Sequence, residues 1–142
     1  MTKKIALIAL VAVFATAGLN NIYAADSMKI GFHAPLTGFA ASDGKSASEG
    51  AKLAIEQINS AGGINGKMLE LVVYDDQAKA AQAIPIANKL IGQDEVIIGV
   101  SGSYSGPTRS AAGVFQESSI PKMACNKGKY LNHILEYLVL YH

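Results

Sequence analysis

The chain has 142 residues, a formal net charge of +1 and an apolar fraction of 50%. This composition excludes a disordered chain and a strongly basic nucleic-acid-binding protein, so no nucleic acid is expected as a partner. The single cysteine, Cys125, cannot form an internal disulfide bond, which excludes a scaffold held together by disulfides.

The first 25 residues have the three parts of a secretory signal peptide. Lys3 and Lys4 form a basic start, an apolar run of about a dozen residues follows, and small residues end the segment at Ala24 and Ala25. A membrane-spanning helix needs about 20 apolar residues, so an uncleaved anchor is the weaker alternative. We therefore expect export, removal of residues 1–25 and one small domain from residue 26 onward.

From Met28 onward, strand patterns alternate with helix patterns, which predicts an α/β fold with a parallel sheet and flanking helices. In chain order, strands are expected at residues 29–34, 68–74 and 96–99, and helices are expected from residue 46, over residues 78–90 and from residue 107. Ile120 and Pro121 should open a fourth strand, but residues 122–129 show neither strand alternation nor a turn.

Local signals set the expected helix starts. Ser46 and Glu49 have the spacing of a capping box, which predicts that the first helix begins at Ser46. Asp75 and Asp76 end the second strand and are expected to start the next helix. As neighbours on a strand they point in opposite directions, which disfavours a catalytic carboxylate pair. Pro85 lacks an N–H and is expected to kink that helix or delay its start.

The most informative loop for binding is Val100–Gly106, between a buried strand and a helix. Ligands of open parallel sheets bind at the carboxyl ends of strands, where a helix start offers free N–H donors. Gly102 would permit a close approach, and the hydroxyls of Ser103 and Ser105 would add donors, so a carboxylate can bind there without a basic side chain. A turn that merely connects two elements is an equal alternative.

Nucleotide-binding loops fit less well. Gly99, Gly102 and Gly106 do not have the spacing of a dinucleotide-binding loop. The segment Gly44–Ser46 resembles the end of a phosphate-binding loop, but the companion glycine is missing because residue 39 is a phenylalanine.

The histidines do not indicate chemistry either. His33, His133 and His142 have no second ligand at metal-binding spacing, and no nucleophile is paired with a base. No metal, no cofactor, no catalytic residue and no enzymatic activity are predicted.

A set of segments, specific in combination, carries a family resemblance. The segments are Pro35-Leu36-Thr37-Gly38, residues 54–59, 62–66, 69–76 and 87–90, and the strand that leads into Ser103. Together they resemble the amino-terminal lobe of the leucine/isoleucine/valine-binding proteins, the periplasmic substrate-binding components of ABC transporters for branched-chain amino acids. The resemblance extends from about Met28 to Pro121.

The resemblance implies a non-enzymatic periplasmic receptor that closes two lobes around an amino acid or small amide and delivers it to an inner-membrane ABC permease. Ser103 takes the place of the serine that binds the ligand carboxylate in this family, with Gly102 and Tyr104 beside it. Ser105 completes the expected ligand-binding set. The family's aromatic residue in the first loop corresponds to Ala40, and Phe39 lies one place earlier.

The resemblance stops near Pro121. The family continues with a strand, a second carboxylate-binding loop and a second lobe, whereas residues 122–142 are interpreted as an unrelated tail. We therefore expect a truncated product, in which a frameshift or a premature stop near Pro121 leaves the lobe of residues 26–121 followed by the unrelated tail of residues 122–142. Two outcomes are open for it, partial ligand binding or a fold remnant that binds nothing.

Overall fold

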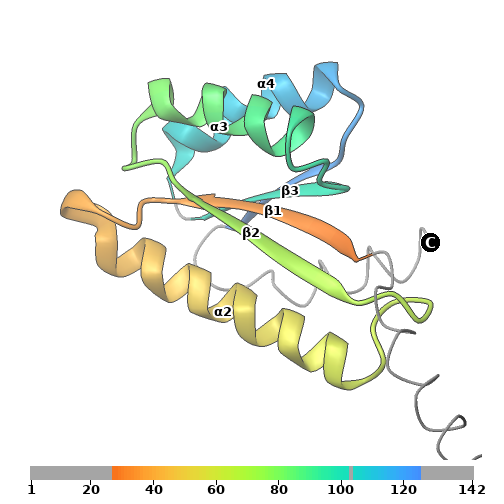
Figure 1. The fold of residues 1–142 in the computed structure, drawn as a ribbon. Coiled ribbons are helices and arrows are strands. Elements are labelled where there is room, and N and C mark those ends of the chain that lie inside the picture. Colours follow the sequence, from red (N-terminus) through yellow and green to blue (C-terminus); the bar gives the residue numbers. More distant parts are fainter. Residues whose placement is uncertain (1–26, 103, 126–142) are drawn as a thin grey trace, which may run out of the picture.

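The computed structural model describes residues 27–102 and 104–125, which form one parallel sheet with helices on both faces. The sheet has the strand order β2-β1-β3-β4. Its strands are β1 (Met28–Ala34), β2 (Leu69–Asp75), β3 (Ile98–Gly102) and β4 (Lys122–Cys125). Helix α2 (Ala41–Ser60) covers one face, and α3 (Ala80–Gly92) and α4 (Ser105–Glu117) cover the other (Figure 1). The α/β prediction is confirmed.

The central strand β1 is buried on both faces, as a parallel sheet between helices requires. Ile30 and Phe32 pack in a core cluster with Ala51 of α2. On the opposite face, a Cβ at Gly31 would lie 3.1 Å from Leu90 of α3. Successive residues of a strand point to opposite faces, so the two halves of the core meet at β1.

The start of α2 differs from the expectation. The chain leaves β1 through a short 3₁₀ helix, η1 (Gly38–Ala40), and α2 begins directly after it at Ala41. The predicted capping box is therefore wrong, since Ser46 lies inside α2. Glu49 instead pairs with Lys52 at 2.7 Å, and both side chains are more than half exposed to solvent.

Gly44 explains how α2 fits so closely beneath the first loop. A Cβ at this position would lie 1.9 Å from the Pro35 carbonyl oxygen, a distance that no side chain can occupy. The glycine of the rejected phosphate-loop motif is therefore a packing residue. It allows the first turns of α2 to lie directly against the loop that follows β1.

Strands β3 and β4 correct two further expectations. Strand β3 runs to Gly102 instead of ending at residue 99, because Ser101 pairs with His33 of β1 and Gly102 pairs with Cys125 of β4. Lys122–Cys125 is a strand, although its local pattern did not predict one. Pairing with the buried strand β3 supplies the backbone hydrogen bonds that this short segment needs.

The remaining boundaries agree approximately with the prediction. Helix α3 continues through Pro85 and begins at Ala80, and Pro107 lies in the first turn of α4 as expected. The predicted signal peptide, residues 1–25, and the part of the predicted tail from residue 126 to 142 lie outside the described residues.

Candidate functional site

The strand order has a topological switch point between the carboxyl ends of β1 and β3, and we call this place the crevice. After β1 the chain passes to α2 on one face, and after β3 it passes to α4 on the other face. Neighbouring parallel strands whose connections leave in opposite directions form the usual ligand site of an open α/β sheet. The predicted loop lies at this point.

The structure places three of the four predicted ligand-binding residues at this crevice. Gly102 is the last residue of β3, Tyr104 is the N-cap of α4 and Ser105 is its first residue. Ser103 lies outside the described residues. We call Gly102, Ser103, Tyr104 and Ser105 the carboxylate half-site, after the group that they are predicted to bind.

The backbone N–H groups of this half-site differ in whether they already donate a hydrogen bond within the protein. The Tyr104 N–H donates to the Gly102 carbonyl at 2.8 Å, so it is already paired. The side chain of the N-cap residue Tyr104 does not cap α4, and Pro107 has no N–H. The N–H groups of Ser105 and Gly106 cannot be paired within the helix, and they lie at its positive end.

Gly102 has a packing role that the sequence did not reveal. A Cβ there would lie 3.0 Å from the Ala34 Cβ and 3.3 Å from the Ala47 Cβ of α2. The absent side chain thus lets the end of β3 lie close to β1 and α2. This contact brings the first loop and the β3–α4 loop together.

Two aromatic residues meet at the crevice. The rings of Phe39 on η1 and Tyr104 are 5.8 Å apart between centroids and perpendicular to each other. Phe39 is 84% exposed, whereas Ala40, the position expected to match the family's aromatic residue, is 2% exposed. The exposed aromatic side chain of the first loop therefore belongs to Phe39, one position before Ala40.

A hydrogen bond connects the two loops across the crevice. The Tyr104 hydroxyl donates to Asp43 Oδ2 at 2.9 Å, and Asp43 lies in the first turn of α2. This bond, followed by the partial burial of the ring and the negative charge of Asp43, raises the pKa of Tyr104 above its ordinary value of 10.0. Tyr104 therefore stays a neutral hydroxyl donor.

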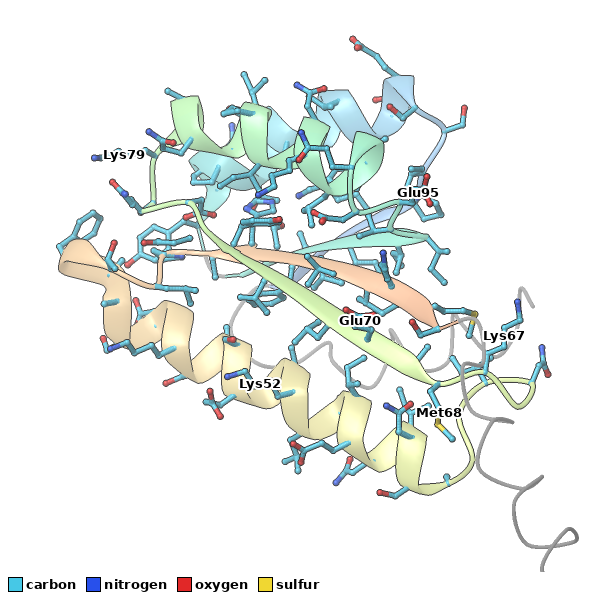
Figure 2. The ribbon with its side chains drawn as sticks, viewed as in Figure 1. Lys52, Lys67, Met68, Glu70, Lys79 and Glu95 are labelled. Carbon is cyan, nitrogen blue, oxygen red and sulfur yellow. The ribbon has the colours of Figure 1, made fainter. Side chains whose placement is uncertain are left out.

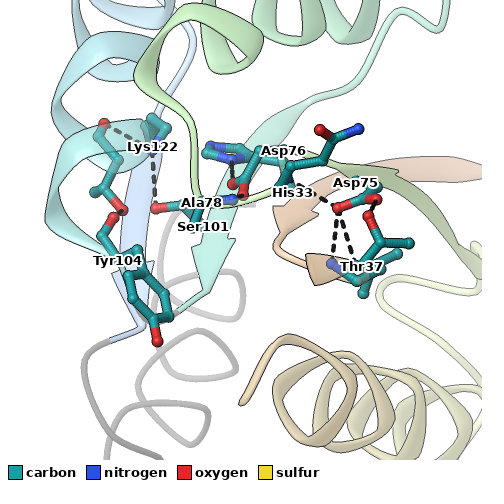
Figure 3. A network of polar contacts seen from close by, with 11 residues as sticks. His33, Thr37, Asp75, Asp76, Ala78, Ser101, Tyr104 and Lys122 are labelled. Carbon is teal, nitrogen blue, oxygen red and sulfur yellow. Dashed lines mark hydrogen bonds and ion pairs between the residues drawn. The ribbon is translucent and has the colours of Figure 1, made fainter. Parts of the chain in front are cut away.

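Asp75 fixes the first loop from the other side (Figure 3). Its carboxylate accepts hydrogen bonds from the Thr37 hydroxyl and from the N–H groups of Leu36 and Gln77. Burial raises the pKa of Asp75, but the hydrogen bonds together outweigh it and hold the pKa below its ordinary value of 3.8. The predicted helix-start role is wrong, because α3 begins at Ala80 with Lys79 as N-cap.

Asp76 points the opposite way, as predicted for adjacent strand residues, and has a different partner. Its Oδ2 lies 2.7 Å from His33 Nδ1, and its Oδ1 accepts a hydrogen bond from the Ala78 N–H at 2.9 Å. Farther along the sheet edge, Lys122 Nζ donates to Ser101 Oγ at 2.9 Å and to the Thr108 carbonyl at 3.2 Å (Figure 3). These contacts hold the strand ends in place, and sequence reasoning missed both of them.

A pocket also exists at the opposite edge of the sheet, where the strands begin. Its lining includes Lys67, in the connection that leads into β2, and Glu95, in the connection that leads into β3 (Figure 2). Parallel sheets bind ligands at the carboxyl ends of their strands, so this pocket is at the wrong edge for the predicted site.

Other kinds of site find no support in the part of the chain that the structure describes. Residues 27–102 and 104–125 contain no group of three metal-binding side chains. Within the same residues, no helix has both the length and the apolar character needed to cross a membrane.

Comparison with known proteins decides the family. Residues 27–130 match the model of the periplasmic binding protein family. The chain belongs to this family. The match extends beyond Pro121, so it includes strand β4 and part of the segment that was interpreted as an unrelated tail.

Relatives within the periplasmic binding protein family include amino-acid-binding proteins. The chain is 40% identical over 112 residues to the leucine-, isoleucine-, valine-, threonine- and alanine-binding protein of Pseudomonas aeruginosa, covering 78% of this chain and 30% of that protein. It thus spans about 30% of that relative's length.

Solved structures show the same partial coverage. The branched-chain amino acid transporter substrate-binding protein of Streptococcus pneumoniae, in complex with isoleucine, has a TM-score of 0.67 at 33% identity, over 72% of this chain and 30% of that one. A solute-binding protein of an ABC transporter from Rhodopseudomonas palustris, in complex with 3,4-dihydroxybenzoic acid, has a TM-score of 0.63 at 26% identity, over 69% and 26%.

Proposed function

We propose that this chain provides the amino-terminal part of a ligand site in the substrate-binding component of an ABC importer for branched-chain amino acids or related small amides. The observation that carries the proposal is the start of α4, which the side chain of its N-cap residue Tyr104 does not cap and which follows β3 at the crevice between β1 and β3. Family membership supports it, because the relatives are substrate-binding transport proteins.

The half-site suits one end of such a ligand. Free N–H groups at the positive end of α4 stabilise a carboxylate without a counter-charge, and the hydroxyls of Ser103 and Ser105 supply further donors. Isoleucine and 3,4-dihydroxybenzoic acid, the ligands in the two solved relatives, both carry a carboxyl group. A carboxylate is therefore the common chemical element on which the proposed site depends.

The proposal also includes the cellular setting. Export through the predicted signal peptide, residues 1–25, would place the protein in the periplasm, and its partner would be an inner-membrane permease. Both elements rest on the family and on the sequence pattern at the amino terminus. The proposed protein binds and delivers its ligand and catalyses no reaction.

The alternative is a fold remnant that binds no ligand. The chain spans about 30% of the length of the Pseudomonas relative, and a site that encloses a small ligand normally buries most of its surface. A half-site of this kind therefore has to be tested for binding directly.

Isothermal titration calorimetry of the purified chain with leucine, isoleucine, valine and short amides separates the two readings. Saturable heat at micromolar ligand, reduced in Ser103→Ala and unchanged in Ser118→Ala, supports the proposed function. Ser118 follows the far end of α4 and serves as the matched control. No heat with millimolar ligand supports the remnant.

A further inference from the structure

A buried ring nitrogen of His33 has no hydrogen-bond partner among the described residues. This atom is Nε2, and the side chain that carries it is fully buried in β1. The other ring nitrogen, Nδ1, lies 2.7 Å from Asp76 Oδ2. An unpaired polar atom in a protein interior costs free energy, and native structures leave few of them. The surroundings of His33 Nε2 therefore indicate which group is suited to pair with it.

A complementary group lies on the neighbouring strand. Ser101 of β3 pairs in register with His33 of β1, and its side chain is also fully buried. Gly31 and Gly99, two positions earlier in these strands, face α3 and α4. Side chains two positions apart in a strand point to the same face. His33 and Ser101 therefore lie side by side beneath α3 and α4.

The hydrogen-bonding roles of the two side chains fit each other. Ser101 Oγ accepts a hydrogen bond from Lys122 Nζ at 2.9 Å, and its own hydroxyl hydrogen has no acceptor among the described residues. The carboxylate of Asp76 can only accept, so the neutral ring of His33 carries its hydrogen on Nδ1 and a lone pair on Nε2. Ser101 thus has a hydrogen to donate where His33 has an acceptor without a donor.

We propose that these side chains form one hydrogen-bond relay that latches β4 onto the rest of the sheet. The strand relay, as we call it, runs from Lys122 to Ser101, His33 and Asp76 in this order (Figure 3). Neighbouring strands lie about 4.8 Å apart, so the Ser101 hydroxyl reaches His33 Nε2 directly or through one water molecule. The ends fix the direction of the relay, because an ammonium group only donates and a carboxylate only accepts.

The strand relay connects the two edges of the described sheet. Strand β4 has four residues and, within the part of the chain that the structure describes, pairs with β3 alone. Lys122 adds two side-chain bonds to this pairing, one to Ser101 and one to the Thr108 carbonyl of α4 at 3.2 Å. Consecutive hydrogen bonds in a protein interior polarise and strengthen one another. The contact of Lys122 should therefore depend on the hydroxyl of Ser101, and the ring of His33 should depend on both.

The ring nitrogens of His33 report the strand relay directly. Nitrogen NMR of the chain labelled in its histidine rings distinguishes a protonated from a bare ring nitrogen, and His33→Gln assigns the signals. At about pH 8, where an imidazole is ordinarily neutral, we expect Nδ1 to carry the hydrogen and Nε2 to be a hydrogen-bonded acceptor. Ser101→Ala should move the Nε2 signal toward that of an acceptor without a hydrogen bond. Ser101→Thr keeps the hydroxyl and should preserve the signal.

A double-mutant comparison tests whether Lys122 acts on His33 through Ser101. Lys122→Met removes the charge and the donors but keeps a long side chain, and it should also move the Nε2 signal. In the Ser101→Ala background the same substitution should cause no further change. Lys52→Met is the matched control, because Lys52 lies on α2 with half of its side chain exposed, and it should leave the signal in place.

Amide hydrogen exchange measures the latch itself. Lys122→Met and Ser101→Ala should each speed the exchange of the backbone amides of residues 122–125 by about tenfold relative to Lys52→Met, because a buried hydrogen bond to a charged group is lost. These measurements need no ligand, so their outcome is independent of the proposed function.

The outcomes decide the proposal in the following way. A protonated Nε2 in the wild type refutes the strand relay without any variant, and so does an Nε2 signal that Ser101→Ala leaves unchanged. Exchange of residues 122–125 at the rate of Lys52→Met overturns the latch. A signal that moves in Ser101→Ala, stays in Ser101→Thr and is accompanied by faster exchange supports the proposal.

Discussion

His33 Nδ1 lies 2.7 Å from Asp76 Oδ2, and both side chains are fully buried at the carboxyl ends of β1 and β2. The second carboxylate oxygen of Asp76 accepts the Ala78 N–H, so one side chain connects β1 to the loop before α3. Asp76 thereby fixes the two strand ends beside the crevice. Removing it would leave the His33 ring and a backbone N–H without their partner inside the protein.

We predict that Asp76→Ala lowers the free energy of unfolding by about 3 kcal/mol, because breaking a buried polar pair leaves the other member unpaired. Urea denaturation measures the change. Glu49→Ala is the control, since it breaks an exposed pair with Lys52 and should cost about 0.5 kcal/mol or less. Equal losses in the two variants would show that the buried pair does not stabilise the fold.

Two glycines of α2 give a second, matched prediction. A Cβ at Gly44 would lie 1.9 Å from the Pro35 carbonyl oxygen, whereas a Cβ at Gly50 would meet nothing within 4 Å. Gly44→Ala should therefore destabilise the protein by about 3 kcal/mol or more, because the helix must move away from the loop. Gly50→Ala should stabilise it by about 0.5–1 kcal/mol, since alanine favours a helix over glycine.

Thermal unfolding followed by circular dichroism compares the two glycine variants directly. The expected shifts of the midpoint have opposite signs. A stable Gly44→Ala protein would mean that α2 does not pack against Pro35 as the structure has it.

The sequence predicted the alternation of strands and helices because that pattern is local. Apolar residues at strand or helix spacing reveal the faces of the elements, and the same reasoning placed Gly102, Tyr104 and Ser105 at the junction of β3 and α4. The role of Asp75 and Asp76 was predicted incorrectly for the same reason. Two acids before a helix suggest a local cap, but their side-chain partners are Thr37 and His33, about 40 positions earlier.

Strand β4 illustrates the same limit. Lys122–Cys125 has no strand alternation, and its conformation depends on backbone pairing with β3 and on the contact of Lys122 with Ser101. The ring contact between Phe39 and Tyr104 also depends on tertiary structure, since the two residues are far apart in the chain. An exposed phenylalanine and an aspartate in a helix gave no signal that they would meet a tyrosine.

Tyr104 provides a spectroscopic prediction about the crevice. The hydrogen bond to Asp43 raises the pKa of Tyr104, so its ring should ionise at a higher pH than an ordinary tyrosine. Asp43→Asn should return the pKa of Tyr104 toward its ordinary value of 10.0, because the charged acceptor is lost. An NMR titration of ring-labelled tyrosine, assigned by Tyr104→Phe, measures both values. An unchanged titration in Asp43→Asn would contradict the bond across the crevice.

Asp75 predicts how acid affects the first loop. Because hydrogen bonds hold the pKa of Asp75 below 3.8, the carboxylate stabilises the folded state fully above the unfolded pKa and loses this effect as the pH falls through the lower, folded pKa. The free-energy difference between the wild type and Asp75→Ala should therefore be largest at about pH 6 and should shrink toward about pH 2. Urea denaturation at several pH values tests this. A difference that is constant over the whole range would mean that the ionised carboxylate does not hold the Thr37 hydroxyl and the N–H groups of Leu36 and Gln77, and that the first loop is fixed by packing alone.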